Sequence, residues 1–153
     1  MELAKTSHAN NIDWELWLAE AFNDYRDVYD AADSAPPAKD FAIEVVELTN
    51  AERKNNGLYP LEVDDELMQL AQIRAEEVSN KYSHERPDGT TVVETHGCGE
   101  NVGARKTAAI QVEKWMASEG HRHNILLERY KRIGVGCYKA DNSRCYWVQI
   151  FKP

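Results

Sequence analysis

The sequence has few basic residues for the number of acidic ones. It contains 18 lysines and arginines against 26 aspartates and glutamates, and the formal net charge is −8. Binding to nucleic acids or to anionic membrane surfaces requires clustered Lys and Arg side chains, whereas the basic residues here are scattered among acidic ones. We therefore expect no nucleic-acid partner.

Long apolar runs are also lacking. No stretch approaches the roughly 18 apolar residues that a membrane-spanning helix needs, so we expect no transmembrane segment. The first residues, MELAKTSHANNIDWELW, contain no apolar core of the kind found in signal peptides. We therefore expect that an exported form of the protein would have its secretion signal outside these residues.

Cysteine is scarce as well, and with three in the chain one is left without a partner. Cys137 and Cys145 flank a turn-like segment, and residues 140–142 would form a three-residue hairpin loop if the two cysteines lay opposite each other. We predict a disulfide between them, which would indicate an oxidising compartment. The alternative is a pair of buried free thiols. Cys98 has no obvious partner.

The remaining composition is that of a globular protein. The chain of 153 residues is 42% hydrophobic and 29% charged, which is typical of one folded domain with a short extension and argues against disorder. Aromatic and apolar residues in 13–30 repeat at helical spacing, and a Pro-containing segment, SAPPAKD, follows at 34–40. We predict an amino-terminal helix and linker over 1–39 and the main domain over 40–153. The aromatic stripe at 13–30 predicts docking on the domain or pairing with a second chain as a homodimer.

Within 40–153 the pattern predicts helices on both sides of a small sheet. One helix follows Asp40 and stops at Gly57, another starts at Asp64 or Asp65, and a third is capped by Thr107. Residues 130–151 contain two runs rich in Val, Ile, Tyr and Trp around a turn, and both faces of each run are apolar. We predict an α+β fold, a three-layer α-β-α sandwich around a small antiparallel sheet.

Polar residues at bends predict a pocket. Glu100 lies in a glycine-flanked GENVG segment that we interpret as a turn, His84 lies in SHERPDG, and His121 follows Gly120. Segments of this kind often carry function. Gly97, Gly99 and Gly103 are interpreted as turn positions with positive φ.

Taken together and in order, LTNAERKNNGLYPLEVDDELMQLA, SHERPDG, GENVG, KWMASEGHRHNIL, IGVGCY and YWVQIF resemble the CAP superfamily (SCP/PR-1/antigen 5), in particular its short bacterial secreted members. The resemblance covers roughly residues 41–153 and implies the same α-β-α sandwich. It also implies a secreted or cell-surface protein.

The resemblance implies a cleft lined by His84, Glu100, Ser118 and His121. Many eukaryotic members hold two His and two Glu in this cavity, and in some this set binds zinc. The position of the second Glu is Ser118 here. Glu94 and Glu113 are weaker candidates for the missing carboxylate.

Several chemistries remain open for these residues. His84 and His121, with Glu100, could hold Zn²⁺ with an open position for water, as in catalytic zinc sites, or Glu100 and an imidazole could act as a general base. The alternative is a hydrogen-bonded polar cluster that orders the loops. Nucleophilic roles for Ser118 or Cys98 are disfavoured, because no G-x-S-x-G segment is present and a carboxylate near Cys98 raises a thiol's pKa.

The sequence thus supports three functions. The first is a module that binds a small ligand, a peptide or a lipid in the cleft. The second is a metal-assisted hydrolase that uses His84, Glu100 and His121 as catalytic residues. The third is an interaction protein that uses the helix at 13–30. The sequence leaves open whether the protein is an enzyme at all.

Overall fold

The computed structural model describes residues 38–140 and 144–153, with the backbone alone at 38–40. In chain order its elements are α2 (Ala38–Asn55), β1 (Glu62–Val63), α3 (Asp65–Asn80), α4 (Val92–His96), β2 (Gly99–Gly103), α5 (Ala108–Met116), α6 (Glu119–Leu126), β3 (Arg132–Lys139) and β4 (Cys145–Lys152). The helix predicted at 13–30 lies outside the described residues. Assembly through that helix stays a prediction.

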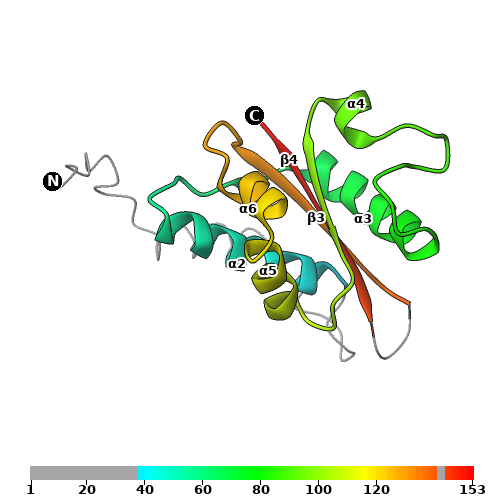
Figure 1. Cartoon of the computed structure of the whole chain (residues 1–153), viewed down its shortest axis with the longest axis horizontal. Helices are drawn as coiled ribbons and strands as arrows, with labels where there is room; N and C mark the ends of the chain where they lie inside the picture. The colour runs from blue at the N-terminus through cyan, green and yellow to red at the C-terminus, as the bar shows by residue number, and fades with distance from the viewer. Residues whose placement is uncertain (1–37, 141–143) are drawn as a thin grey trace, which may run out of the picture.

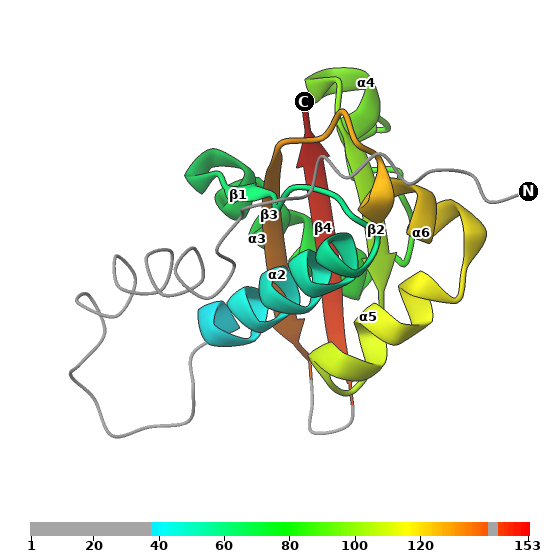
Figure 2. The ribbon, with the colours of Figure 1, turned by 90° about the vertical axis from the view of Figure 1, so that its left-hand side faces the viewer.

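These elements form three layers, as predicted (Figures 1 and 2). Helices α2, α5 and α6 cover one face of the sheet, and α3 and α4 cover the other. Each face has its own apolar cluster, one including Val45, Trp115 and Ile133, the other including Val78 and Val148. Burying both faces explains why the strands carry apolar residues on both sides.

The sheet has the strand order β1-β3-β4-β2. The β3–β4 pair is the predicted antiparallel hairpin, β2 adds an antiparallel strand beside β4, and the two residues of β1 run parallel to β3. The predicted antiparallel sheet therefore has a short parallel edge. Its other edge is β2, which we show below to frame the candidate site.

The predicted disulfide is wrong. Cys137 and Cys145 are free thiols in the structure, and both are buried. The hairpin register places Cys137 opposite Trp147 and Cys145 opposite Lys139, two residues away from the predicted register. The hairpin loop is correspondingly longer than the predicted 140–142. A two-residue offset leaves every side chain on its predicted face, so the apolar pattern alone does not distinguish the two registers.

Helix α3 lies directly on β3 because two glycines of that strand leave room for it. A Cβ atom on Gly134 would overlap the backbone of Leu67, and a Cβ on Gly136 would overlap the backbone of Ala71. Small side chains on α3 allow the same close approach, since Ala71 and Ala75 are fully buried. The position of α3 relative to the sheet is therefore fixed by backbone contact.

Helix ends agree with the prediction where a capping side chain is present. Asp64 accepts a hydrogen bond from the backbone of Leu67 at the start of α3, and Thr107 accepts one from Ile110 at the start of α5. One predicted end is wrong, because helix α2 begins at Ala38, before Asp40.

A buried arginine in α2 ties this layer together. Among the described residues, the guanidinium of Arg53 donates hydrogen bonds to backbone carbonyls alone. They belong to Tyr59 at 2.8 Å, Ile125 at 2.8 Å, Leu127 at 3.2 Å and Tyr130 at 3.4 Å. Burial lowers the pKa of Arg53 to about 10, so it remains charged at neutral pH. It connects α2 to the segment that carries α6 into β3.

Candidate functional site

The candidate site is built on the free edge of β2. The GENVG segment is this buried edge strand and not the turn that we predicted from its glycines. We predicted positive φ angles for Gly97, Gly99 and Gly103. Of these three, only Gly97, just before the strand, has a positive φ, at 61°. Because side chains alternate along a strand, neighbouring residues of β2 serve opposite layers. Glu100 faces the α3 layer, and Asn101 faces the α6 layer.

Glu100 is held by an arginine and a histidine. Its side chain is only 1% exposed. Arg74 of α3 donates from Nε to Oε2 at 2.8 Å and from a terminal nitrogen to Oε1 at 3.1 Å. His84 Nδ1 lies 2.9 Å from Oε1. An ionised carboxylate only accepts hydrogen bonds, so His84 Nδ1 carries a proton, and in the neutral imidazole Nε2 is then an acceptor.

These contacts keep Glu100 ionised. Burial alone would raise the pKa of Glu100, but hydrogen bonds from His84 and Arg74 outweigh burial and hold the pKa below its usual value. The contacts with Glu100 and Glu77 likewise raise the pKa of Arg74 against the opposing effect of burial. The buried charges therefore persist at neutral pH as a pair.

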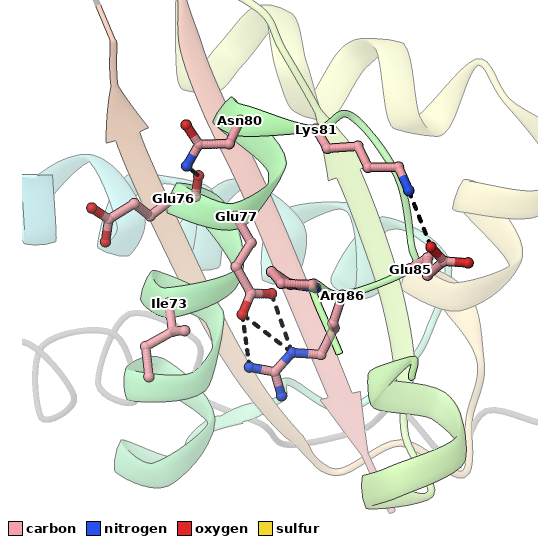
Figure 3. A pocket seen from close by; sticks show the side chains of 8 residues that line it. Ile73, Glu76, Glu77, Asn80, Lys81, Glu85 and Arg86 are labelled. Atoms are coloured by element: carbon pink, nitrogen blue, oxygen red, sulfur yellow. Dashed lines mark hydrogen bonds and ion pairs between the residues drawn. The ribbon is translucent and has the colours of Figure 1, made fainter. Parts of the chain in front are cut away.

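The pair extends outward into a charge network. Arg74 also donates to Glu77 at 2.6 Å, and Glu77 accepts three more hydrogen bonds from Arg86, the shortest at 2.9 Å. Figure 3 shows Glu77 and Arg86 facing each other beside a cavity of about 470 Å³, which is separate from the candidate site. Two arginines and two glutamates make this network neutral overall. Arg74 further fixes the His84 loop by donating to the carbonyl of Ser83 at 2.9 Å.

His121 approaches from the other layer. Ser118 is the N-cap of α6, but its hydroxyl does not cap the helix; it lies 2.9 Å from His121 Nδ1. Asn101 donates to the carbonyl of His121 at 3.1 Å. Burial and the proximity of His84 both lower the pKa of His121. The two histidines thus lie on either side of β2, each oriented by a different partner.

A cavity of about 510 Å³ opens at this edge. Two of the predicted cleft residues, His84 and Glu100, line it, whereas Ser118 and His121 are not among its lining residues. The remaining wall consists of Val93, Gly97, Cys98, Gly99, Asn124, Arg129 and Tyr130. The cavity therefore opens at the β2 edge, between the segment from α4 into β2 and the residues Asn124, Arg129 and Tyr130, and the His121–Ser118 pair lies outside its lining.

The residues present do not fit the zinc site that the family resemblance implies. Both oxygens of Glu100 are engaged by Arg74, whose positive charge would oppose a cation. Across the described parts of the chain, no group of three or more His, Cys, Asp or Glu side chains is arranged to hold a metal ion. Two imidazoles remain, fewer than the three protein ligands of a catalytic zinc site.

Cys98 does not have the properties of a nucleophile. Burial, followed by the negative charge of Glu100, raises the pKa of Cys98 to about 11, and its thiol lies 3.3 Å from the carbonyl of Val92. The thiol is therefore protonated at neutral pH, as the neighbouring carboxylate led us to expect. Glu94 and Glu113 are both exposed and supply no second buried carboxylate.

The sequence reasoning missed Arg74, Asn124's link to Glu100 and Arg129. Arg74 did leave a signal, because it falls on the buried stripe of α3 between Ala71 and Val78. A lone arginine among apolar helix positions calls for a buried acid as partner. Arg129 left no comparable signal.

Comparison with known proteins gives the same family as the motifs. The sequence pattern of the cysteine-rich secretory protein family (CAP) matches residues 46–151. The chain belongs to the CAP family. An uncharacterised protein of Bacillus subtilis, YkwD, is 36% identical over 118 residues, covering 70% of this chain and 45% of YkwD. The chain therefore spans less than half of that relative.

Solved structures share the fold. A Bacillus anthracis extracellular protein containing an SCP domain has a TM-score of 0.66 at 24% identity, covering 78% of this chain and 44% of that protein. An outer surface protein of Borrelia burgdorferi has a TM-score of 0.64 at 22% identity, covering 80% of this chain and 98% of the Borrelia protein. At these identities the likeness concerns the fold. Within the described residues, no helix is both long and apolar enough to cross a membrane.

Proposed function

We propose that this CAP domain is an extracellular or cell-surface binding module whose cleft takes a small ligand, with the lining residues His84 and Glu100 and the neighbouring His121–Ser118 pair as its functional residues. The observation that carries the proposal is the oriented imidazole of His84. Its Nδ1 is fixed by the buried Glu100, while its side chain is 55% exposed and lines a cavity of about 510 Å³. An exposed ring held by a buried ion pair is preorganised to hydrogen-bond a ligand.

Three features support binding over hydrolysis. The cavity is of a size that suits a small ligand. The carboxylate is committed to Arg74 and is not available to a metal ion or as a base. The Cys98 thiol is protonated at neutral pH. We therefore do not extend the proposal to metal-assisted hydrolysis, and we place the ligand among small organic molecules, peptides and lipids.

Binding in the cleft is testable by nuclear magnetic resonance. The ¹⁵N-labelled chain is titrated with a fragment set that includes short peptides, fatty acids and sugars. We expect amide shifts concentrated at residues 84, 93–100, 124 and 129–130 for at least one class. His84→Ala should weaken that binding about tenfold, as expected for the loss of one hydrogen bond to the ligand.

His123→Ala is the matched control, because His123 is exposed on α6 and does not line the cavity. We expect this variant to bind like the wild type. Shifts that map elsewhere on the molecule, or equal affinity of the His84→Ala variant, would contradict the proposal.

A further inference from the structure

The cleft carries a positive charge that the buried network does not balance. Glu100 lines the cavity, but its charge is compensated within the neutral set of Arg74, Glu77, Arg86 and Glu100. Arg129, which also lines the cavity, is exposed, and its only recorded partner among the described residues is the ring of Tyr130, 5.6 Å from the guanidinium carbon. The cleft therefore presents a free guanidinium in a chain whose net charge is −8.

Arg129 is placed by its neighbour rather than by an acid. Tyr130 is buried and stacks on Phe151, with the ring centroids 5.5 Å apart. A Cβ on Gly99 would overlap the Tyr130 hydroxyl, so the glycine at the start of β2 lets this ring close the cavity floor. Contact with a fixed aromatic ring orients the guanidinium without neutralising it.

The same cavity also offers hydrogen-bond acceptors, from His84 and Asn124. In the neutral imidazole of His84, Nε2 is an acceptor because Nδ1 donates to Glu100. Asn124 Nδ2 donates to Asn101 Oδ1 at 2.9 Å and to the Glu100 carbonyl at 3.4 Å, which fixes the amide orientation. Asn124 Oδ1 then remains as the second acceptor, since no partner for it is recorded among the described residues.

A guanidinium and two hydrogen-bond acceptors in one cavity match the carboxyl-terminal end of a peptide. A peptide with a free carboxyl terminus has a carboxylate and, within a residue of it, backbone N–H donors. Planar guanidinium groups recognise carboxylates through paired hydrogen bonds. Alkyl chains fit less well, because Val93 is the lining residue with substantial exposed apolar surface, at 52%, whereas Tyr130 is only 4% exposed.

We propose that the cleft binds short peptides by their free C-terminal carboxylate, with Arg129 as the carboxylate-binding residue and His84 and Asn124 as acceptors for peptide N–H groups. This inference rests on the proposed function and names the ligand class of the same cleft. It adds a specificity-determining residue, Arg129, to the predicted set.

The test compares three probes on the ¹⁵N-labelled whole chain: N-acetyl-alanyl-alanine, its C-terminal amide, and dodecanoate below its micelle concentration. We expect the acid to shift the resonances of the cavity residues and the amide to bind about tenfold more weakly, because one charge-assisted contact is lost. Arg129→Gln should weaken binding of the acid by a similar factor, and Arg129→Lys by less.

Arg144→Gln is the matched control. Arg144 is an exposed arginine that precedes β4, at the end of that strand opposite to Phe151, which pairs with Gly99. Removing its charge changes the net charge by the same amount far from the cleft. We expect this variant to bind the acid like the wild type, and an equal loss in both glutamine variants would reduce the effect to net charge and overturn the inference.

The probes also separate failure of this inference from failure of the proposed function. Equal binding of acid and amide in the cleft, or binding of dodecanoate in place of the peptides, overturns carboxylate-terminal recognition and leaves a ligand-binding cleft. If none of the three probes moves the cavity resonances at millimolar concentration, the inference is overturned, and the fragment titration with its His84→Ala variant decides the wider proposal independently.

Discussion

Two fully buried arginines lie on opposite sides of the sheet, and they are used differently. Arg53 of α2 donates only to main-chain carbonyls, and burial lowers its pKa. Arg74 of α3 contacts two carboxylates, and its pKa is raised. Arg53 therefore satisfies the carbonyls of loops that need donors, while Arg74 sets the charge state of an acid. The comparison indicates that Arg74, unlike Arg53, holds an ionised carboxylate that lines a cavity.

Removing Arg74 should have the largest effect on stability. Arg74→Met leaves the buried Glu100 without its charge partner, and breaking a buried ion pair on one side costs about 3–5 kcal/mol. Urea denaturation measures this loss in the free energy of unfolding. In the double variant Arg74→Met/Glu100→Met the orphaned charge is gone, so we expect at least half of the loss to be recovered. No recovery would mean that Arg74 acts through packing alone.

Removing Arg53 should lower the free energy of unfolding by less than removing Arg74, and a second substitution at a nearby acid should not restore it. Arg53→Met leaves carbonyls at Tyr59, Ile125 and Leu127 without this donor, and we expect a loss of about 2–3 kcal/mol. Glu128 is the nearby acid that affects the pKa of Arg53, and it is exposed. Adding Glu128→Gln to Arg53→Met should therefore restore nothing measurable in the same denaturation assay. If Glu128→Gln restored a substantial part of the lost stability, Arg53 would, like Arg74, act through an acidic partner.

The pH dependence of unfolding should separate the two sides further. The pKa values of Glu100 and Glu77 are held below their usual values, so each contributes stability above the unfolded pKa of about 4.3, which is lost as pH falls through the folded pKa. The free energy of unfolding should decline in acid, and less steeply in Glu100→Gln. Denaturation series between about pH 6 and pH 2.5 test this; parallel curves would assign the acid sensitivity to other groups.

The smallest effect should come from the histidine that completes the site. His84→Ala should change the free energy of unfolding by less than about 1 kcal/mol, because an exposed partner of an ion pair contributes little to stability. Ligand binding should nevertheless weaken, as described above. A thermal or urea unfolding curve measures the first quantity, and a loss above about 2 kcal/mol would show that His84 is structural.

Much of the fold was predictable because it depends on local pattern. The apolar stripes and the capping residues Asp64 and Thr107 define helices, and apolar residues on both faces of the carboxyl-terminal strands define the middle layer. The hairpin register was not predictable from alternation, which is the same after a shift of two residues. The expected cysteine pair favoured the wrong register.

The site was predictable only in part, and for a related reason. His84 and Glu100 were named from motifs and lie together in the structure. The direction of each β2 side chain follows from strand alternation, but GENVG looks like a turn by composition, so that argument was not available. Arg74 was absent from the predicted set because its carboxylate partner is 26 residues away in sequence, and a long-range pair has no local spacing.

The glycines of β3 have a consequence for how the cleft responds to an occupant. With Leu67 and Ala71 resting on the strand backbone at Gly134 and Gly136, α3 has no space to slide or tilt toward the sheet. The position of Arg74 relative to β2 is therefore fixed, and the Glu100 carboxylate that it binds is fixed as well. Accommodation of differently shaped guests therefore falls to exposed side chains of the cavity wall such as Val93, around an immobile acid.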